Sequence, residues 1–167
     1  MPEMCDEQQY RDAEVAAAGM LSRRPLSAAM LEQKLLDKGF APEAADYAVQ
    51  RMRLLRAIDD EAYAEMLIRS YRNKGYGALR IRQELYQRSV PKDIAAQQLR
   101  NMEPNWEKMH ALLEKKLRGD VSDRKQREKA MAALQRRGFT FSEIKIAMDN
   151  YRAELQQQQE EEEFYVD

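Results

Sequence analysis

The residues in this sequence best suited to hold an anion lie between Arg69 and Arg88. The stretch holds six cationic residues and one acid, Glu84, in a chain of 167 residues whose net charge is −1. The cations are Arg69, Arg72, Lys74, Arg80, Arg82 and Arg88. Six like charges facing one acid are unfavourable without an anionic partner, so the stretch predicts a surface that binds phosphate or carboxylate groups. A solvated basic face is the alternative.

Two glycines flank Tyr76 in the middle of this stretch and predict a helix that stops, turns and restarts. Gly75 can take the left-handed conformation that ends a helix, and Gly77 precedes the next one. Free N–H groups at that new N-terminus, with Lys74 and Arg80 beside them, form a candidate anion nest. The alternative is that both glycines only make a tight turn.

A second basic cluster, from Lys115 to Arg137, holds nine cations and three acids. Its candidate binding residues are Lys115, Lys116, Arg118, Arg124, Lys125, Arg127, Arg136 and Arg137. Some should pair with acids one helical turn away, and two or three should face the same side as the first stretch. Tyr76 and Tyr86 are candidates for stacking on unpaired bases. Core packing is the alternative for Tyr76, whereas Tyr86 is expected to be exposed.

Catalytic and metal chemistry find little support in the sequence. Cys5 and His110 are the single cysteine and the single histidine, so an internal disulfide and a Cys/His zinc site are excluded. No phosphate-binding Walker loop or dinucleotide-binding glycine pattern occurs. Asp59, Asp60 and Glu61 are explained more simply as helix-capping residues than as metal ligands. We expect neither an enzyme nor a cofactor.

Composition favours helix throughout. Apolar residues make up 44% and charged residues 34%, whereas glycine and proline are scarce. No apolar run approaches the roughly 20 residues that span a bilayer, so we expect a cytoplasmic, soluble monomer. The C-terminal segment QQQQEEEEFYVD, residues 156–167, is expected to be disordered or a frayed extension of the last helix.

A repeat of 49 or 50 residues organises the chain. Leu26 and Leu31 are spaced as the two apolar residues that fix a helix entry, and Tyr76 and Ile81 repeat that spacing. A third copy is indicated farther on, where Gly138-Phe139 repeats Gly39-Phe40. Ser27 is the expected N-cap in the first copy, as Asp59 is for the first helix of the second.

The repeats predict an all-α fold of three tandem three-helix units, stacked as an elongated, curved array. The expected organisation is an N-terminal tail (1–9), repeat 1 (10–56), repeat 2 (57–103), repeat 3 (104–155) and an acidic tail (156–167). A three-helix unit of this length is marginal alone, so neighbours should supply part of each core.

The middle repeat contains DDEAYAEMLIRSYRNK (59–74) followed directly by GYGALRIRQEL (75–85). This stretch resembles the RecX family, bacterial regulators of the RecA recombinase. LSAAMLEQKLLDKGF (26–40) is similar to the family's first module and ALQRRGFTFSEIKIAM (133–148) to its last. The short polar loop at Arg118–Val121 and the acidic tail depart from the family pattern.

The resemblance implies a partner and an activity. It implies binding to the RecA–single-stranded DNA filament, which would block extension or promote disassembly and lower strand exchange, ATP hydrolysis and repressor cleavage. The basic residues of both clusters would then contact RecA carboxylates or the filament's DNA. A free-standing DNA-binding repeat protein is the alternative, since basic three-helix units resemble helix-turn-helix modules. A helical scaffold with no nucleic-acid role is a third.

Overall fold

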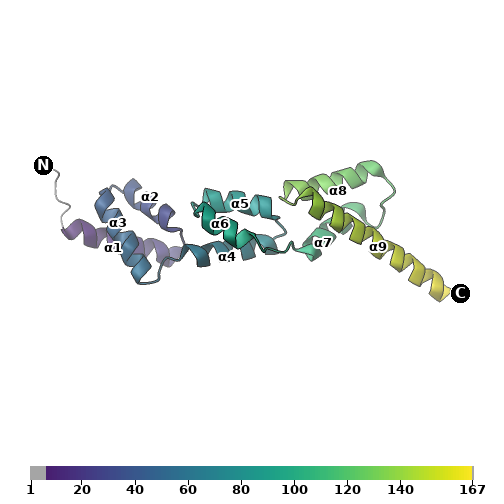
Figure 1. Cartoon of the computed structure of the whole chain (residues 1–167), viewed down its shortest axis with the longest axis horizontal. Helices are drawn as coiled ribbons and strands as arrows, with labels where there is room; N and C mark the ends of the chain where they lie inside the picture. Colours follow the sequence, from purple (N-terminus) through teal and green to yellow (C-terminus); the bar gives the residue numbers. More distant parts are fainter. Residues whose placement is uncertain (1–6, 167) are drawn as a thin grey trace. The chain divides into compact units, whose positions relative to one another are not determined.

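Three successive groups of three helices make up the protein, described over residues 7–166 in a computed structural model (Figure 1). The helices are α1 (Glu7–Arg23), α2 (Ala28–Asp37), α3 (Pro42–Leu54), α4 (Asp60–Asn73), α5 (Ala78–Gln87), α6 (Lys92–Leu99), α7 (Trp106–Leu117), α8 (Arg124–Arg136) and α9 (Phe141–Val166). No strand occurs among residues 7–166. The all-α class and the three three-helix repeats are confirmed. Residues 1–6, including Cys5 and most of the expected N-terminal tail, lie outside the described part, as does Asp167.

Side-chain caps start the helices where the sequence predicts them. The Ser27 hydroxyl accepts a hydrogen bond from the backbone N–H of Met30 at 3.2 Å, and the Asp59 carboxylate accepts one from Ala62 at 3.1 Å. Each bond satisfies an amide that the first turn of a helix leaves without an intrahelical partner. The N-cap predictions for Ser27 and Asp59 are therefore confirmed.

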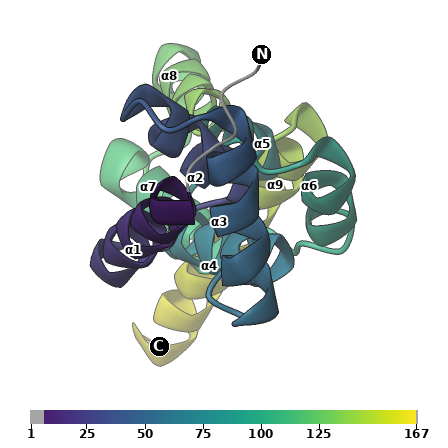
Figure 2. The same cartoon turned by 90° about the vertical axis from the view of Figure 1, so that its left-hand side faces the viewer.

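Repeat 1 is built on the packing of α1 against α3 (Figure 2), and α2 contacts both helices. Small residues at the contact, Ala13 and Ala17 on α1 and Ala44 and Ala48 on α3, are fully buried. Leu31 and the other apolar residues of α2 complete the core. Small side chains let the axes of α1 and α3 approach closely. The leucines of α2 fill the rest of this core.

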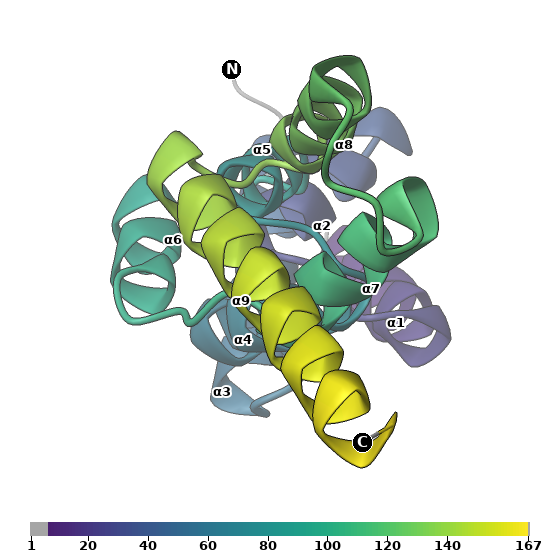
Figure 3. The same cartoon turned by 90° about the vertical axis from the view of Figure 1, so that its right-hand side faces the viewer.

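Repeat 3 has a core of larger side chains. Leu113 on α7, Leu134 on α8 and Tyr151 on α9 are buried together, and Phe139 joins them from the α8–α9 turn. Figure 3 shows α9 as one uninterrupted helix beside α7 and α8. The helix continues to Val166, and every residue from Gln156 to Val166 is exposed. The expectation of a disordered tail was therefore wrong over the described residues, and its alternative, an extension of the last helix, is what the structure shows.

The described chain forms two compact units whose boundaries cut through the middle repeat. Unit 1 takes the chain up to Leu67 together with Glu84–Arg100, and unit 2 takes Ile68–Gln83 together with the chain from Asn101 onward. The helices α4 and α5 are therefore each divided between the two units. Repeat 2 contributes residues 57–67 and 84–100 to unit 1, together with repeat 1. It contributes residues 68–83 and 101–103 to unit 2, together with repeat 3.

In unit 1, the start of α2 docks on the second repeat through two polar contacts. The Ser27 hydroxyl donates to the carbonyl of Arg88 at 2.7 Å, and the Ala28 N–H donates to the Asp60 carboxylate at 2.9 Å. Ser27 is fully buried. One hydroxyl thus caps α2 and satisfies a carbonyl at the end of α5, so the N-cap is also a joint between repeats.

Replacing Ser27 with alanine should therefore cost more than an ordinary N-cap. Loss of the cap costs about 1 kcal/mol, and leaving the Arg88 carbonyl unsatisfied adds roughly 1–3 kcal/mol. We expect a lower urea midpoint by circular dichroism and faster amide hydrogen exchange around Arg88. Ser22→Ala is the matched control, because the exposed Ser22 hydroxyl donates to the carbonyl of Gly19 within its own helix. Equal losses for the two variants would show that the joint contributes nothing.

Candidate polyanion-binding surface of unit 2

The turn between α4 and α5 ends the first helix as its glycines predict. The Tyr76 N–H donates to the carbonyl of Tyr71 at 3.1 Å, and the Gly75 N–H donates to that of Arg72 at 3.0 Å. Gly75 lies at φ +88°. This pair of bonds around one left-handed residue is the Schellman arrangement, which satisfies carbonyls that the last turn leaves open.

The N-terminus of α5 is occupied by the protein itself. The Gly77 N–H donates to the carbonyl of Arg137 at 2.8 Å, and the Leu79 N–H donates to that of Gly138 at 3.1 Å. The backbones meet so closely that a Cβ on Gly77 would stand 2.5 Å from the Gly138 carbonyl. Both amides therefore already donate to carbonyls of the α8–α9 turn. The expectation of an open anion nest at Gly75 and Gly77 is corrected accordingly.

Cations from both basic clusters gather around Tyr76. The guanidinium carbons of Arg80 and Arg137 lie 5.7 Å and 5.6 Å from the centre of its ring, and Tyr71 meets the ring edge-on at 5.9 Å. The Lys74 ammonium lies 5.2 Å from the Tyr71 ring centre. Aromatic faces attract cations, so this cluster fixes several positive charges in a small volume. Tyr76 is half-buried, and its ring has Arg80, Arg137 and Tyr71 as neighbours.

Arg72 and Arg137 hold the turns together. Arg72 donates from Nε to the carbonyl of Glu103 at 2.7 Å and from Nη2 to that of Pro104 at 3.4 Å, which fixes the entry to α7. Arg137 donates from Nη1 to the carbonyl of Lys74 at 3.3 Å. Both side chains are half-buried. Arg72 and Arg137, which the sequence suggested as anion-binding residues, therefore bridge to backbone carbonyls.

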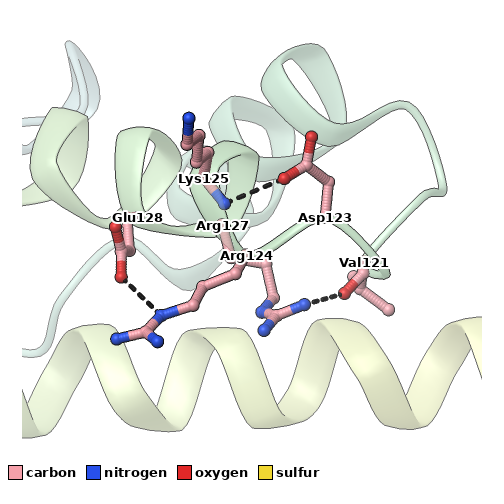
Figure 4. A network of polar contacts seen from close by, with 6 residues as sticks. All are labelled: Val121, Asp123, Arg124, Lys125, Arg127 and Glu128. Carbon is pink, nitrogen blue, oxygen red and sulfur yellow. Dashed lines mark hydrogen bonds and ion pairs between the residues drawn. The ribbon is translucent and has the colours of Figure 1, made fainter.

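The second basic cluster is partly used at the start of α8 (Figure 4). Arg127 donates to the carbonyl of Val121 at 2.5 Å, and Arg124 pairs with Glu128 at 2.9 Å, one helical turn away. Asp123 caps the helix by accepting from the Lys125 N–H at 2.9 Å. The expected pairing of cluster cations with nearby acids is therefore confirmed at Arg124. Such exposed pairs contribute little, about 0.3–0.5 kcal/mol each, and leave most of the positive field in place.

Exposed cations remain at many positions of unit 2. They are Arg69, Lys74, Arg80, Arg82, Lys115, Lys116, Arg118, Arg124, Lys125 and Arg136. Arg118 ends α7 with φ +50°, a conformation that fixes the backbone and leaves its side chain at the surface. The other two predicted residues, Tyr86 and Arg88, belong to unit 1, where Tyr86 is 70% exposed as expected and Arg88 is half-buried. Exposed arginines and lysines at this density can bind phosphates or carboxylates.

Polar residues that the sequence did not single out link α7 to α9. The Tyr151 hydroxyl donates to the Glu114 carboxylate at 2.6 Å and accepts from the Gly119 N–H at 2.9 Å. Burial, followed by the hydrogen bond to Glu114, raises the pKa of Tyr151. His110 lies 2.5 Å from the Glu154 carboxylate. These contacts join distant residues by tertiary folding, so no local spacing in the sequence indicates them.

Residues 7–166 contain no group of three or more His, Cys, Asp or Glu side chains arranged to hold a metal ion. No helix within that part of the chain has the length and apolar character needed to cross a membrane.

A tandem of three three-helix domains, with a basic stretch at Arg69–Arg88 in the second, defines the class of protein, and its similarity to known proteins gives the family. Residues 13–52, 59–99 and 103–148 match, in that order, the first, second and third three-helix domains of RecX. The chain belongs to the RecX family.

Individual relatives agree with that assignment. Regulatory protein RecX of Vibrio parahaemolyticus is 34% identical over 135 residues, which cover 80% of this chain and 87% of the relative. The protein of the same name from Xanthomonas campestris is 35% identical over 133 residues, covering 78% and 82%. The crystal structure of RecX from Lactobacillus salivarius superposes with a TM-score of 0.81 at 22% identity, over 87% of this chain and 98% of that one. The names of these relatives support a regulatory role.

Proposed function

We propose that this protein binds RecA or the RecA–single-stranded DNA filament and inhibits its extension, ATP hydrolysis and recombination activity. The observation that carries the proposal is the match of all three RecX domains, in order, over most of the chain. Such a regulator works in the cytoplasm, without a catalytic step or cofactor of its own, on DNA recombination, DNA repair and the SOS response.

The exposed cations of unit 2 supply the physical counterpart of this proposal. A RecA–DNA filament presents carboxylates and a phosphate backbone, and both are ligands that guanidinium groups bind in pairs of hydrogen bonds. Arg80 and Arg82 stand where the first repeat has Met30 and Glu32, so the fold of a repeat does not require arginine at these positions. We assign the contact to the exposed arginines and lysines, with Arg72, Arg127 and Arg137 positioning them.

The test is RecA activity on single-stranded DNA in the presence of substoichiometric amounts of this protein. We expect slower ATP hydrolysis and less strand exchange, because one bound regulator affects many subunits of a filament. Unchanged RecA activity at every ratio would overturn the proposal. Inhibition that appears only when the protein saturates the DNA, and that vanishes steeply with salt, would instead favour the free-standing DNA-binding alternative.

A further inference from the structure

An apolar groove of about 450 Å³ opens in unit 2 between α8, the first turn of α5, and the α8–α9 turn with the start of α9. Phe139 and Ile144 form a buried floor, and half-buried Met131 lines the side. Leu79 and Phe141 stand at the edge, 47% and 75% exposed. Large apolar side chains gathered around a hollow are typical of a surface that another molecule covers. The proposed contact with RecA or DNA was assigned to exposed arginines and lysines, and none of them lines this groove.

The C-terminal end of α9 presents highly exposed apolar side chains. Phe164, Tyr165 and Val166 are 81%, 85% and 85% exposed, and the Phe164 and Tyr165 rings pack only edge to face at 5.8 Å. Four consecutive glutamates, residues 160–163, precede them. The segment 160–166, here called the acidic–aromatic segment, therefore combines a negative charge with an apolar tip.

Charge at the groove complements this segment. Exposed Lys145 follows Phe141 by one helical turn on α9, so its charge lies on the same side of the helix as the groove edge. The acid in the lining, Glu128, is already paired with Arg124, as Figure 4 shows. A negatively charged segment with an apolar tip is thus attracted by the rim and can fill the floor, whereas a basic segment is repelled.

The groove cannot receive the segment of its own chain. Ile144 and Phe164 lie on the same continuous helix, twenty residues apart, which places them about 30 Å from each other along its axis. We propose that the groove of one copy receives the acidic–aromatic segment of a second copy. Because groove and segment occupy opposite ends of α9, antiparallel pairing of two α9 helices makes both contacts at once. The result is a closed dimer with two equivalent sites.

Such a dimer is weak, because each site covers only a short helical end. Contacts well below the roughly 1,200 Å² of standard interfaces are transient, with dissociation constants on the order of 10 µM or weaker. The protein is then a monomer when dilute, as its sequence led us to expect, and a dimer when concentrated. Dissociation should also become easier with salt, because the glutamates meet a cationic rim.

The test is sedimentation equilibrium of the full chain over a wide concentration range, with variants on each side of the contact. The tail variant, Phe164→Asp with Tyr165→Asp, removes the apolar side chains at the end of the segment. The groove variant, Leu79→Asp with Phe141→Asp, replaces the apolar side chains at the groove edge with carboxylates. All four residues are exposed, so folding should persist, which circular dichroism checks. Each double variant should weaken self-association more than tenfold. Gln156→Asp with Gln159→Asp adds the same charge to the same helix and should weaken it less than threefold.

A mixture of the two double variants separates this arrangement from others. The tail variant keeps an intact groove and the groove variant keeps an intact tail, so the mixture can form one of the two sites. We expect the mixture to associate more strongly than either variant alone and less strongly than the wild type, because it keeps one site of two. A wild type that is monomeric at the highest concentration overturns the proposal. So do dimerisation that survives both double substitutions and a mixture that associates no more strongly than either variant alone.

Discussion

Replacing Gly138 with alanine is expected to destabilise unit 2 by roughly 3 kcal/mol or more. The residue has φ +94°, a conformation that costs an alanine about 1–2 kcal/mol. An added Cβ would also overlap the backbone nitrogen of Arg80 and stand 2.5 Å from its Cβ. Overpacking of this kind costs typically 1–3 kcal/mol, and here the overlapped atoms include backbone that cannot rotate away.

Two glycines of the same backbone class provide controls for that prediction. Gly39 occupies the equivalent turn of repeat 1 at φ +96° with nothing within 4 Å of an added Cβ, and Gly119 in unit 2 meets only Leu155 at 3.8 Å. Their alanine variants report the conformational cost alone. The single tryptophan, Trp106, lies in α7, so its fluorescence follows unit 2 during urea unfolding. If Gly138→Ala lowers the free energy of unfolding no more than Gly119→Ala does, then the overlap with Arg80 carries no measurable penalty and the prediction is wrong.

Reversing two charges on α5, Arg80→Glu with Arg82→Glu, should lower inhibition of RecA by roughly tenfold or more. A tenfold change corresponds to about 1.4 kcal/mol, which is modest for two cations turned into anions at a surface that meets carboxylates or phosphates. The measurement is the concentration of this protein that halves RecA ATP hydrolysis on single-stranded DNA. Circular dichroism should show an unchanged helical content, since both side chains are exposed.

The matched control is Arg23→Glu with Arg24→Glu, at the end of α1. It changes the net charge by the same amount at two exposed residues, beside the turn of repeat 1 that corresponds to the α4–α5 turn. We expect inhibition within about twofold of the wild type, because only long-range charge changes there. Equal losses in the two double variants would mean that net charge, not the α5 surface, drives binding. Full activity of the α5 variant would place the contact elsewhere.

Local sequence signals were sufficient to predict the helices and the repeat. Caps such as Ser27 and Asp59, and the glycine at position 75, act within one helical turn, so their effect can be read from neighbouring residues. The exposed position of Tyr86 followed from the apolar spacing of α5. The length of α9 did not follow, because glutamine and glutamate are good helix formers whose block of charge also suggests disorder.

The roles of individual cations depended on tertiary contacts that the sequence does not display. Arg72, Arg127 and Arg137 are indistinguishable by type from Arg80 and Arg82, yet they bind carbonyls 6 to 63 residues away. The N–H groups of Gly77 and Leu79 looked free because their acceptors lie on another repeat. A count of charges therefore located the basic region but could not separate binding residues from supporting ones.

The middle repeat contributes one half to each compact unit, so the repeat in sequence and the unit in space are out of phase. This offset bears on how such arrays change in evolution. A duplication or deletion of one full period would join equivalent positions of the repeat wherever its breakpoints fall. Each compact unit, in contrast, is made of two separate stretches of the chain, so no single cut in the sequence releases it whole.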